Sequence, residues 1–179
     1  MSLSNISRSF TIIALWLLAS AAAIALPDDR EKTISIESDS AERNEKTGLT
    51  VYRGNVIISQ GSILIEADEI TLHYQGKKIS RIECTGTPAS YQQIPETEGQ
   101  PMIARAEHID YLLAEDQIIL KRNAVLSRNG TIIKGDSIDY DIKKETWKAK
   151  GNDLGEQKRI QLVIPPSVQE STATDETTP

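Results

Sequence analysis

The chain of 179 residues has few of the side chains on which catalysis and metal binding depend. It contains two histidines, His73 and His108, and neither has a partner at the spacing of a zinc site. By alternation, both should point outward from their strands. The sequence has no G-x-S-x-G, P-loop or dinucleotide-binding pattern. We therefore expect a protein that is not an enzyme and that uses no metal and no cofactor.

Cysteine and aromatic residues are also scarce. The single cysteine, Cys84, excludes an internal disulfide. We expect it to be buried beside neighbours such as Ile82, with a reactive or intermolecular role as the alternative. Aromatic residues make up 4% of the chain, too few for a platform that stacks sugars or bases. The net charge of −6 makes nucleic acid an unfavourable partner.

One hydrophobic run is present, at the N-terminus, and no second run follows it. Arg8 precedes an apolar stretch from Phe10 to Leu18, and Ala23-Ile24-Ala25 follows as a cleavage pattern. The run is shorter than the roughly 20 residues that span a bilayer. We expect residues 1–25 to be a secretory signal, with an uncleaved membrane anchor as the alternative.

A short phrase recurs four times along the rest of the chain. It consists of a small residue, an acid, a variable residue and an apolar residue, and its acids are spaced by 29, 39 and 29 residues: Asp39, Asp68, Glu107 and Asp136. A turn-like break follows each acid 15 to 18 residues later, at Gly54-Asn55, Gly86-Thr87, Arg122-Asn123 and Gly151-Asn152. Such recurrence predicts stacked copies of one hairpin unit. The acids should mark points where strands begin or bend, and their side chains should accept backbone N–H groups.

Apolar residues alternate with polar ones from Thr33 to Ile164, which is typical of an all-β protein. The two halves superpose at an offset of 68 residues, so they are internal duplicates. Asn129-Gly130 predicts a two-residue hairpin turn, with Gln60-Gly61 as its counterpart. We expect one antiparallel domain over residues 26–168, an exposed loop over Gln92–Pro101 and a disordered tail over residues 169–179.

The inner face predicted by alternation is mainly Ile, Leu and Val. Such a face, arranged as a trough, suits acyl chains. The alternative is that these side chains fill one another's space as an ordinary closed core.

Several short sequence segments occur in a characteristic order: Ile34-Ser35-Ile36-Glu37-Ser38-Asp39, Gly54-Asn55-Val56, Gln60-Gly61, Ile65-Glu66-Ala67-Asp68, Gly86-Thr87-Pro88-Ala89 and Ile133-Lys134-Gly135-Asp136-Ser137-Ile138. Over about Thr33 to Ser167 the chain resembles the LptA (OstA-like) family of lipopolysaccharide transport bridge proteins. The resemblance implies a V-shaped antiparallel β-jellyroll in the periplasm that holds lipid A acyl chains inside. It also implies head-to-tail oligomers that link LptC at the inner membrane to LptD at the outer membrane.

Five residues match lipid-lining positions of that family: Ile34, Ile36, Tyr91, Tyr111 and Leu113. The resemblance also makes Arg159–Ile164 the strand that pairs with the next copy, and Pro165-Pro166 would end it. Two rival interpretations remain. One is an anchored, LptC-like subunit or the LptD domain of the same machine, and the other is a closed structural β scaffold of the envelope.

Overall fold

The computed structural model describes residues 29–94, 100–152 and 159–166, and these are almost entirely antiparallel β-structure. A short 3-10 helix, η1 (Asp29–Glu31), precedes the strands. The strands are β1 (Ile34–Glu37), β2 (Ser40–Asn44), β3 (Leu49–Gln60), β4 (Ile63–Gln75), β5 (Lys78–Gln93), β6 (Met102–Leu112), β7 (Gln117–Arg128), β8 (Thr131–Asp141), β9 (Thr146–Lys150) and β10 (Gln161–Val163). The all-β prediction is confirmed. The predicted signal (1–25) and tail (169–179), and residues 95–99 of the predicted loop, lie outside the described residues.

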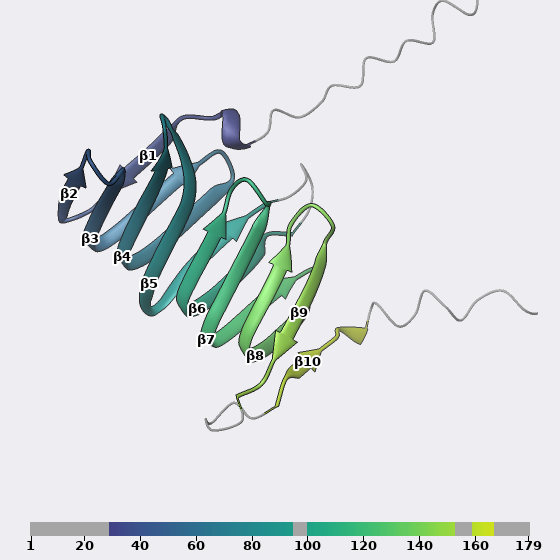
Figure 1. Ribbon diagram of the computed structural model, residues 1–179. Coiled ribbons are helices and arrows are strands. Elements are labelled where there is room, and N and C mark those ends of the chain that lie inside the picture. The colour runs from purple at the N-terminus through teal and green to yellow at the C-terminus, as the bar shows by residue number, and fades with distance from the viewer. Residues whose placement is uncertain (1–28, 95–99, 153–158, 167–179) are drawn as a thin grey trace, which may run out of the picture.

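The strands form one sheet in the order β1-β3-β4-β5-β6-β7-β8-β10, with β2 also on β3 and β9 also on β8 (Figure 1), so consecutive strands are neighbours from β2 to β9. Sequential antiparallel pairing follows from the short turns, because two-residue loops join only adjacent antiparallel strands. One such loop is Asn129-Gly130, as predicted, since Arg128 pairs with Thr131. Its counterpart is Gly61-Ser62. The predicted Gln60-Gly61 was wrong by one residue, because Gln60 is still paired with Ile63.

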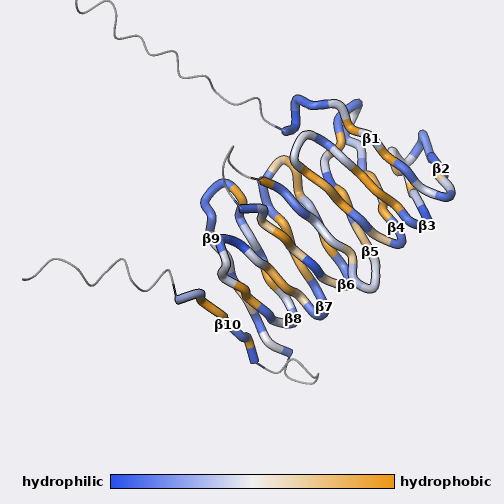
Figure 2. The backbone as a smooth tube through the Cα atoms, turned by 180° about the vertical axis from the view of Figure 1, so that it is seen from behind, coloured by the Kyte–Doolittle hydropathy of each residue, from blue (hydrophilic) through white to orange (hydrophobic). Residues whose placement is uncertain are grey.

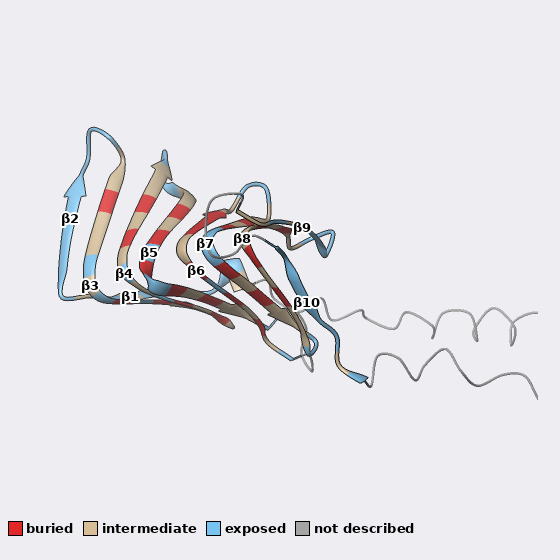
Figure 3. Ribbon diagram, turned by 90° about the horizontal axis from the view of Figure 1, so that it is seen from below, coloured by how far each residue is buried: buried red, intermediate tan, exposed pale blue. Residues whose placement is uncertain are grey.

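Each long strand bends once, and the bends divide the sheet into two arms. The ladder shifts register at the same level in five successive pairings, between β3 and β8. The first arm contains β2, β9 and segments 49–53, 69–75, 78–85, 108–112, 117–121 and 137–141. The second arm contains β1, β10 and segments 56–60, 63–67, 89–93, 102–106, 124–128 and 131–135. The sheet therefore curls over itself, as Figure 3 shows from below.

The recurring phrase and the turn-like breaks build the corner between the arms. Gly54 and Asn55 have φ of 79° and 46°, a left-handed conformation that bends the strand. A side chain at Gly54 would also collide with Asp39, whose Oδ2 lies 2.2 Å from an ideal Cβ position. The predicted bend at the acids is thus confirmed.

The hydrogen-bond donors to these acids differ from the prediction. Asn55 Nδ2 donates to Asp39 at 3.0 Å, and the equivalent pairs are Asn123 to Glu107 at 2.7 Å, Asn152 to Asp136 at 3.3 Å and Thr87 to Asp68 at 3.5 Å. The predicted backbone donors give way to side chains because antiparallel pairing places each break beside the acid of the preceding strand. The corner is a row of repeated polar contacts.

The space between the arms is filled by apolar side chains from both. Figure 2 shows these residues as stripes across the strands, and the fully buried ones include Ile70, Leu72, Ile109, Ile118 and Leu120. Cys84 belongs to this core at 1% exposure, as predicted, and burial raises the pKa of its thiol.

The outer face of the first arm carries polar side chains that are more closely paired than the sequence indicated. His73 Nε2 lies 2.9 Å from Glu83, and His108 Nε2 lies 3.5 Å from Asp110. Both histidines are therefore half-buried beside carboxylates on that face, whereas the sequence predicted only an outward direction.

Candidate functional site

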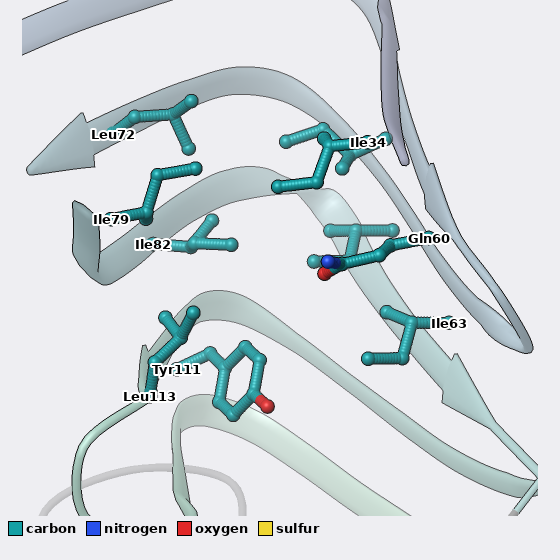
Figure 4. Close-up of a pocket in the computed structure, with 10 residues that line it drawn as sticks. Ile34, Gln60, Ile63, Leu72, Ile79, Ile82, Tyr111 and Leu113 are labelled. Atoms are coloured by element: carbon teal, nitrogen blue, oxygen red, sulfur yellow. The ribbon is translucent and has the colours of Figure 1, made fainter. Parts of the chain in front are cut away.

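The interior of the N-terminal half contains three of the five predicted site residues in one small pocket. Ile34 comes from β1 in the second arm, and Tyr111 and Leu113 come from β6 and the turn after it in the first arm (Figure 4). The other lining residues are Ile58, Gln60, Ile63, Ile65, Leu72, Ile79 and Ile82. Apart from Gln60, these side chains are aliphatic, and those labelled in Figure 4 gather around the space between the arms.

This pocket is nearly closed. Its cavity volume is about 10 Å³, and a single water needs roughly 10–15 Å³. An alkyl chain does not fit in that space. In this part of the interior the two apolar faces therefore pack on each other.

Tyr91, another predicted site residue, lies behind Tyr111 and is completely buried. The two rings come from opposite arms and meet edge to face, with their centroids 5.4 Å apart at an interplanar angle of 68°. The Tyr91 hydroxyl donates to Gln93 Oε1 at 2.9 Å, so its polar end is satisfied. Burial is the main cause that raises the pKa of Tyr91 well above its ordinary value.

Ile36, the last of the five predicted residues, lies on the edge strand β1 together with Ile34. It is half-buried, packs against the core and pairs with Ile58 of β3. The five predicted residues thus gather in the N-terminal half of the molecule. Their role in binding lipid stays a prediction.

The C-terminal half contains a wider cavity that sequence reasoning missed. Its volume is about 260 Å³, and its lining is Leu126, Arg128, Asn129, Thr131, Ile133, Tyr140, Glu145 and Trp147. Alternation already placed Tyr140 inward, and Trp147 pairs directly with it. The inward direction of Tyr140 was the signal available in the sequence, whereas its pairing with Trp147 depends on cross-strand register.

The last strand exposes an apolar edge beside this cavity. Ile160, Leu162 and Ile164 are 47%, 46% and 46% exposed, and Leu162 pairs with inward-facing Ile133. The predicted strand Arg159–Ile164 is observed as β10, Gln161–Val163, and within the described chain its only strand partner is β8. An unpaired strand edge is a template for another chain.

No group of three or more His, Cys, Asp or Glu side chains in residues 29–94, 100–152 and 159–166 could hold a metal ion. In the same ranges no helix has the length and apolar character to cross a membrane.

The apolar interior, the corner repeat and the open edges can be compared with known proteins. Residues 35–146 match the family described as LptA/(LptD N-terminal domain) LPS transport protein. The chain belongs to this LptA/LptD N-terminal domain family. The matched segment begins in β1 and ends at the first residue of β9, so it includes both arms and the corner.

Members of the LptA/LptD N-terminal domain family are similar over nearly the whole chain. The lipopolysaccharide export system protein LptA of Haemophilus influenzae is 31% identical, covering 93% of this chain and 96% of its own. LptH of Pseudomonas aeruginosa is 34% identical over 83% and 88%, and LptA of Escherichia coli K12 is 33% identical over 92% and 88%. These relatives are named as export proteins, not as enzymes.

One solved structure shows the same fold. The crystal structure of LptH, the LptA-homologous periplasmic component of the lipopolysaccharide transport device of Pseudomonas aeruginosa, superposes with a TM-score of 0.72 at 31% identity. The match covers 78% of this chain and all of that one.

Proposed function

We propose that this protein is a periplasmic bridge that binds lipopolysaccharide and carries it from the inner to the outer membrane. The observation that supports this most strongly is the apolar interior, which both arms line from the N-terminal edge to the C-terminal cavity in a member of an LPS transport family. The acyl chains lie between the arms, and the sugars and phosphates remain in water. Ile34, Ile36, Tyr91, Tyr111 and Leu113 contact the acyl chains.

The energetics of such a site suit transport. Each buried CH₂ contributes about 0.8 kcal/mol, so several acyl chains bind strongly without any directional contact. An aliphatic wall offers equivalent contacts at each step. An acyl chain that slides along it therefore replaces each apolar contact with an equivalent one. The direction of movement must come from energy supplied by a partner.

The strand directions favour head-to-tail assembly. From β1 to β10, and from β2 to β9, the sheet order runs through an odd number of antiparallel steps. The two edge strands of each arm are therefore antiparallel to each other. A copy placed end to end in the same orientation continues both arms as antiparallel sheets, with β10 beside β1 and β9 beside β2. The same pairing joins the bridge to LptC at one end and to LptD at the other, and a processed N-terminal signal delivers the chain to the periplasm.

The test of lipid binding is a charge placed on the inner wall. Leu113→Asp should weaken lipid A binding at least tenfold, because a carboxylate among acyl chains carries a penalty of several kcal/mol. Ile57→Asp is the matched control, since Ile57 is 37% exposed and its neighbour Ile58 faces inward. Isothermal titration with lipid A measures both variants, and circular dichroism checks that they fold. Equal affinities for wild type and Leu113→Asp would favour a closed scaffold, which the 10 Å³ pocket makes the second candidate.

A further inference from the structure

The rim of the V, opposite the corner, is bridged by the helix η1. Arg30 Nη1 donates to the carbonyl oxygen of Leu113 at 3.0 Å, and its guanidinium pairs with Asp116. Both acceptors lie in the turn between β6 and β7, at the tip of the first arm. Asp29, the preceding residue, accepts the backbone N–H of Ser62 at 2.8 Å and the Ser62 hydroxyl at 2.6 Å, at the tip of the second arm. The helix is thus tied to both arms.

A second arginine crosses the rim in the C-terminal half. Arg128 is the last residue of β7 in the second arm. Its guanidinium donates to the Tyr140 hydroxyl and pairs with Glu145, and both acceptors belong to the first arm or its β8–β9 turn. Arg128 and Glu145 also line the 260 Å³ cavity, so this crossing stands directly over the wider part of the interior.

Within residues 29–94, 100–152 and 159–166, the other connections between the arms are of two kinds. At the corner the strands continue from arm to arm, but their ladders are interrupted by bulges in five successive pairings. In the interior the contacts are apolar, apart from the polar ends of a few residues, and apolar contacts are non-directional. Among the described strands, every backbone ladder joins neighbours within one arm. Directional links across the rim therefore come from side chains.

The 10 Å³ pocket lined by Ile34, Tyr111 and Leu113 has no space for an alkyl chain, so the arms must separate there before one enters. The interrupted corner provides a place to bend, because the bulged residues are already outside the regular ladder. Opening exposes the apolar walls to water, and the acyl chains then cover them. Every such movement increases the distance between Arg30 and Asp116 and between Arg128 and Glu145.

We propose that Arg30 and Arg128 are two latches that hold the arms closed, and that both must release for acyl chains to enter. This inference rests on the proposed function. The ion pairs are half-exposed, with side-chain exposures of 34% and 27% for Arg30 and Asp116 and 20% and 55% for Arg128 and Glu145. Pairs of this kind add little to folding stability. In this proposal the two ion pairs instead set the rate at which the arms separate.

The first experiment measures the rate of loading. Lipid A with a fluorescent acyl chain is mixed with the mature full-length protein in a stopped-flow instrument. Arg30→Gln and Arg128→Gln should each load several-fold faster than wild type, and the double variant at least tenfold faster. Arg53→Gln is the matched control, because Arg53 pairs with Glu69 at 2.7 Å on adjacent strands within the first arm. Its loading rate should not change. Exchanging the charges, with Arg128→Glu and Glu145→Arg together, should restore slow loading.

The second experiment closes one latch covalently. Arg128→Cys and Glu145→Cys are joined by a reducible bis-maleimide, and native Cys84 does not compete because it is buried. The crosslinked protein should load at least tenfold more slowly, and reduction should restore the rate. Unchanged rates in the double glutamine variant, or equally fast loading of the crosslinked protein, would overturn the latches even if lipid A binds at equilibrium. Absence of any lipid A binding to wild type would instead refute the proposed function.

Discussion

The two ends of the folded sheet expose very different surfaces. At the N-terminal end every residue of β2 is exposed, and all but one of them are polar. Arg43 lies over the Tyr74 ring at 4.9 Å from its centroid, so a cation covers the aromatic face. Ile34 and Ile36 on β1 are half-buried against the core. At the C-terminal end Trp147 is 40% exposed and Leu162 46% exposed, beside an open cavity.

This difference indicates which end depends on a partner. The N-terminal end is compatible with water in the isolated chain, because its apolar groups are partly covered. The C-terminal end leaves several large apolar side chains uncovered, and exposed apolar surface of this kind marks interaction sites. A contact between two C-terminal ends would cover these side chains as well as a head-to-tail joint would. The antiparallel edge strands favour the head-to-tail joint, because β10 can then pair with β1 and β9 with β2.

The largest expected effect is at the C-terminal edge. Leu162→Asp combined with Ile164→Asp should weaken self-association at least a hundredfold, because two carboxylates would be buried in the joint at a cost of several kcal/mol. Light scattering over a concentration series measures the change. Deletion of residues 159–179 should have the same effect while the fold remains intact. Oligomers of unchanged size after either change would show that the C-terminal edge is not the surface that depends on a partner.

A mixing experiment distinguishes head-to-tail from tail-to-tail joints. The double aspartate variant retains a normal N-terminal end, so it should add to the exposed C-terminal end of wild type and stop further growth. Native mass spectrometry of the mixture should show mixed pairs. Pairs made only of wild-type chains would indicate contact between two C-terminal ends.

The next effect concerns two residues of the C-terminal cavity that differ in burial. Leu126 is 2% exposed and Trp147 is 40% exposed. Leu126→Ala should reduce the free energy of unfolding by about 2–5 kcal/mol, because it leaves a cavity in the core. Trp147→Ala should cost clearly less in the monomer and should instead weaken self-association. Urea unfolding of a non-associating variant measures the first quantity, and equal losses would show that Trp147 belongs to the core.

The smallest of these effects is expected at Asp110, which lies midway between the two ends of the sheet. Burial raises the pKa of this carboxyl, but hydrogen bonds from Arg81 at 2.6 Å and Lys121 at 3.1 Å outweigh burial, so the pKa is lowered overall. The ionised carboxylate therefore stabilises the fold above about pH 4 and loses this contribution as the pH falls through its folded pKa.

Asp110→Asn should thus cost about 1–3 kcal/mol at neutral pH. Urea titrations from pH 7 down to pH 3 should show the gap between variant and wild type shrinking below about pH 4. Since Asp110 lies at neither end, self-association at neutral pH should be unchanged. A constant gap down to pH 3 would mean that the carboxylate does not act through its charge.

Much of the fold was predictable because it repeats. The alternation of residues such as Ile70, Leu72 and Tyr74 indicated which face is buried, and the spacing of Asp39 and Asp68 located the corner. The partners of those acids were not predictable, because Asn55 and Asn123 come beside them only through cross-strand register. Gln93 as the partner of Tyr91 was hidden for a different reason. The sequence placed Gln93 in an exposed loop over Gln92–Pro101, whereas it is the last residue of β5 and so lies on the same face as Tyr91.

The site was only partly predictable. The resemblance selected two residues near the N-terminal edge and three on central strands, and three of the five share a pocket. The crossings by Arg30 and Arg128 depend on how closely the two arms approach, and no local pattern encodes that distance. Whether the apolar inner face is open or closed depends on that same distance between the arms.

The central claim is that acyl chains of lipopolysaccharide occupy the space between the arms, and photo-crosslinking in cells tests it most directly. A photoreactive amino acid at Ile36 or Leu113 should capture lipopolysaccharide, whereas the same group at Ile57, on the outer surface, should not. Capture at Ile57 alone, or at none of the three positions in cells that export lipopolysaccharide normally, would contradict the account.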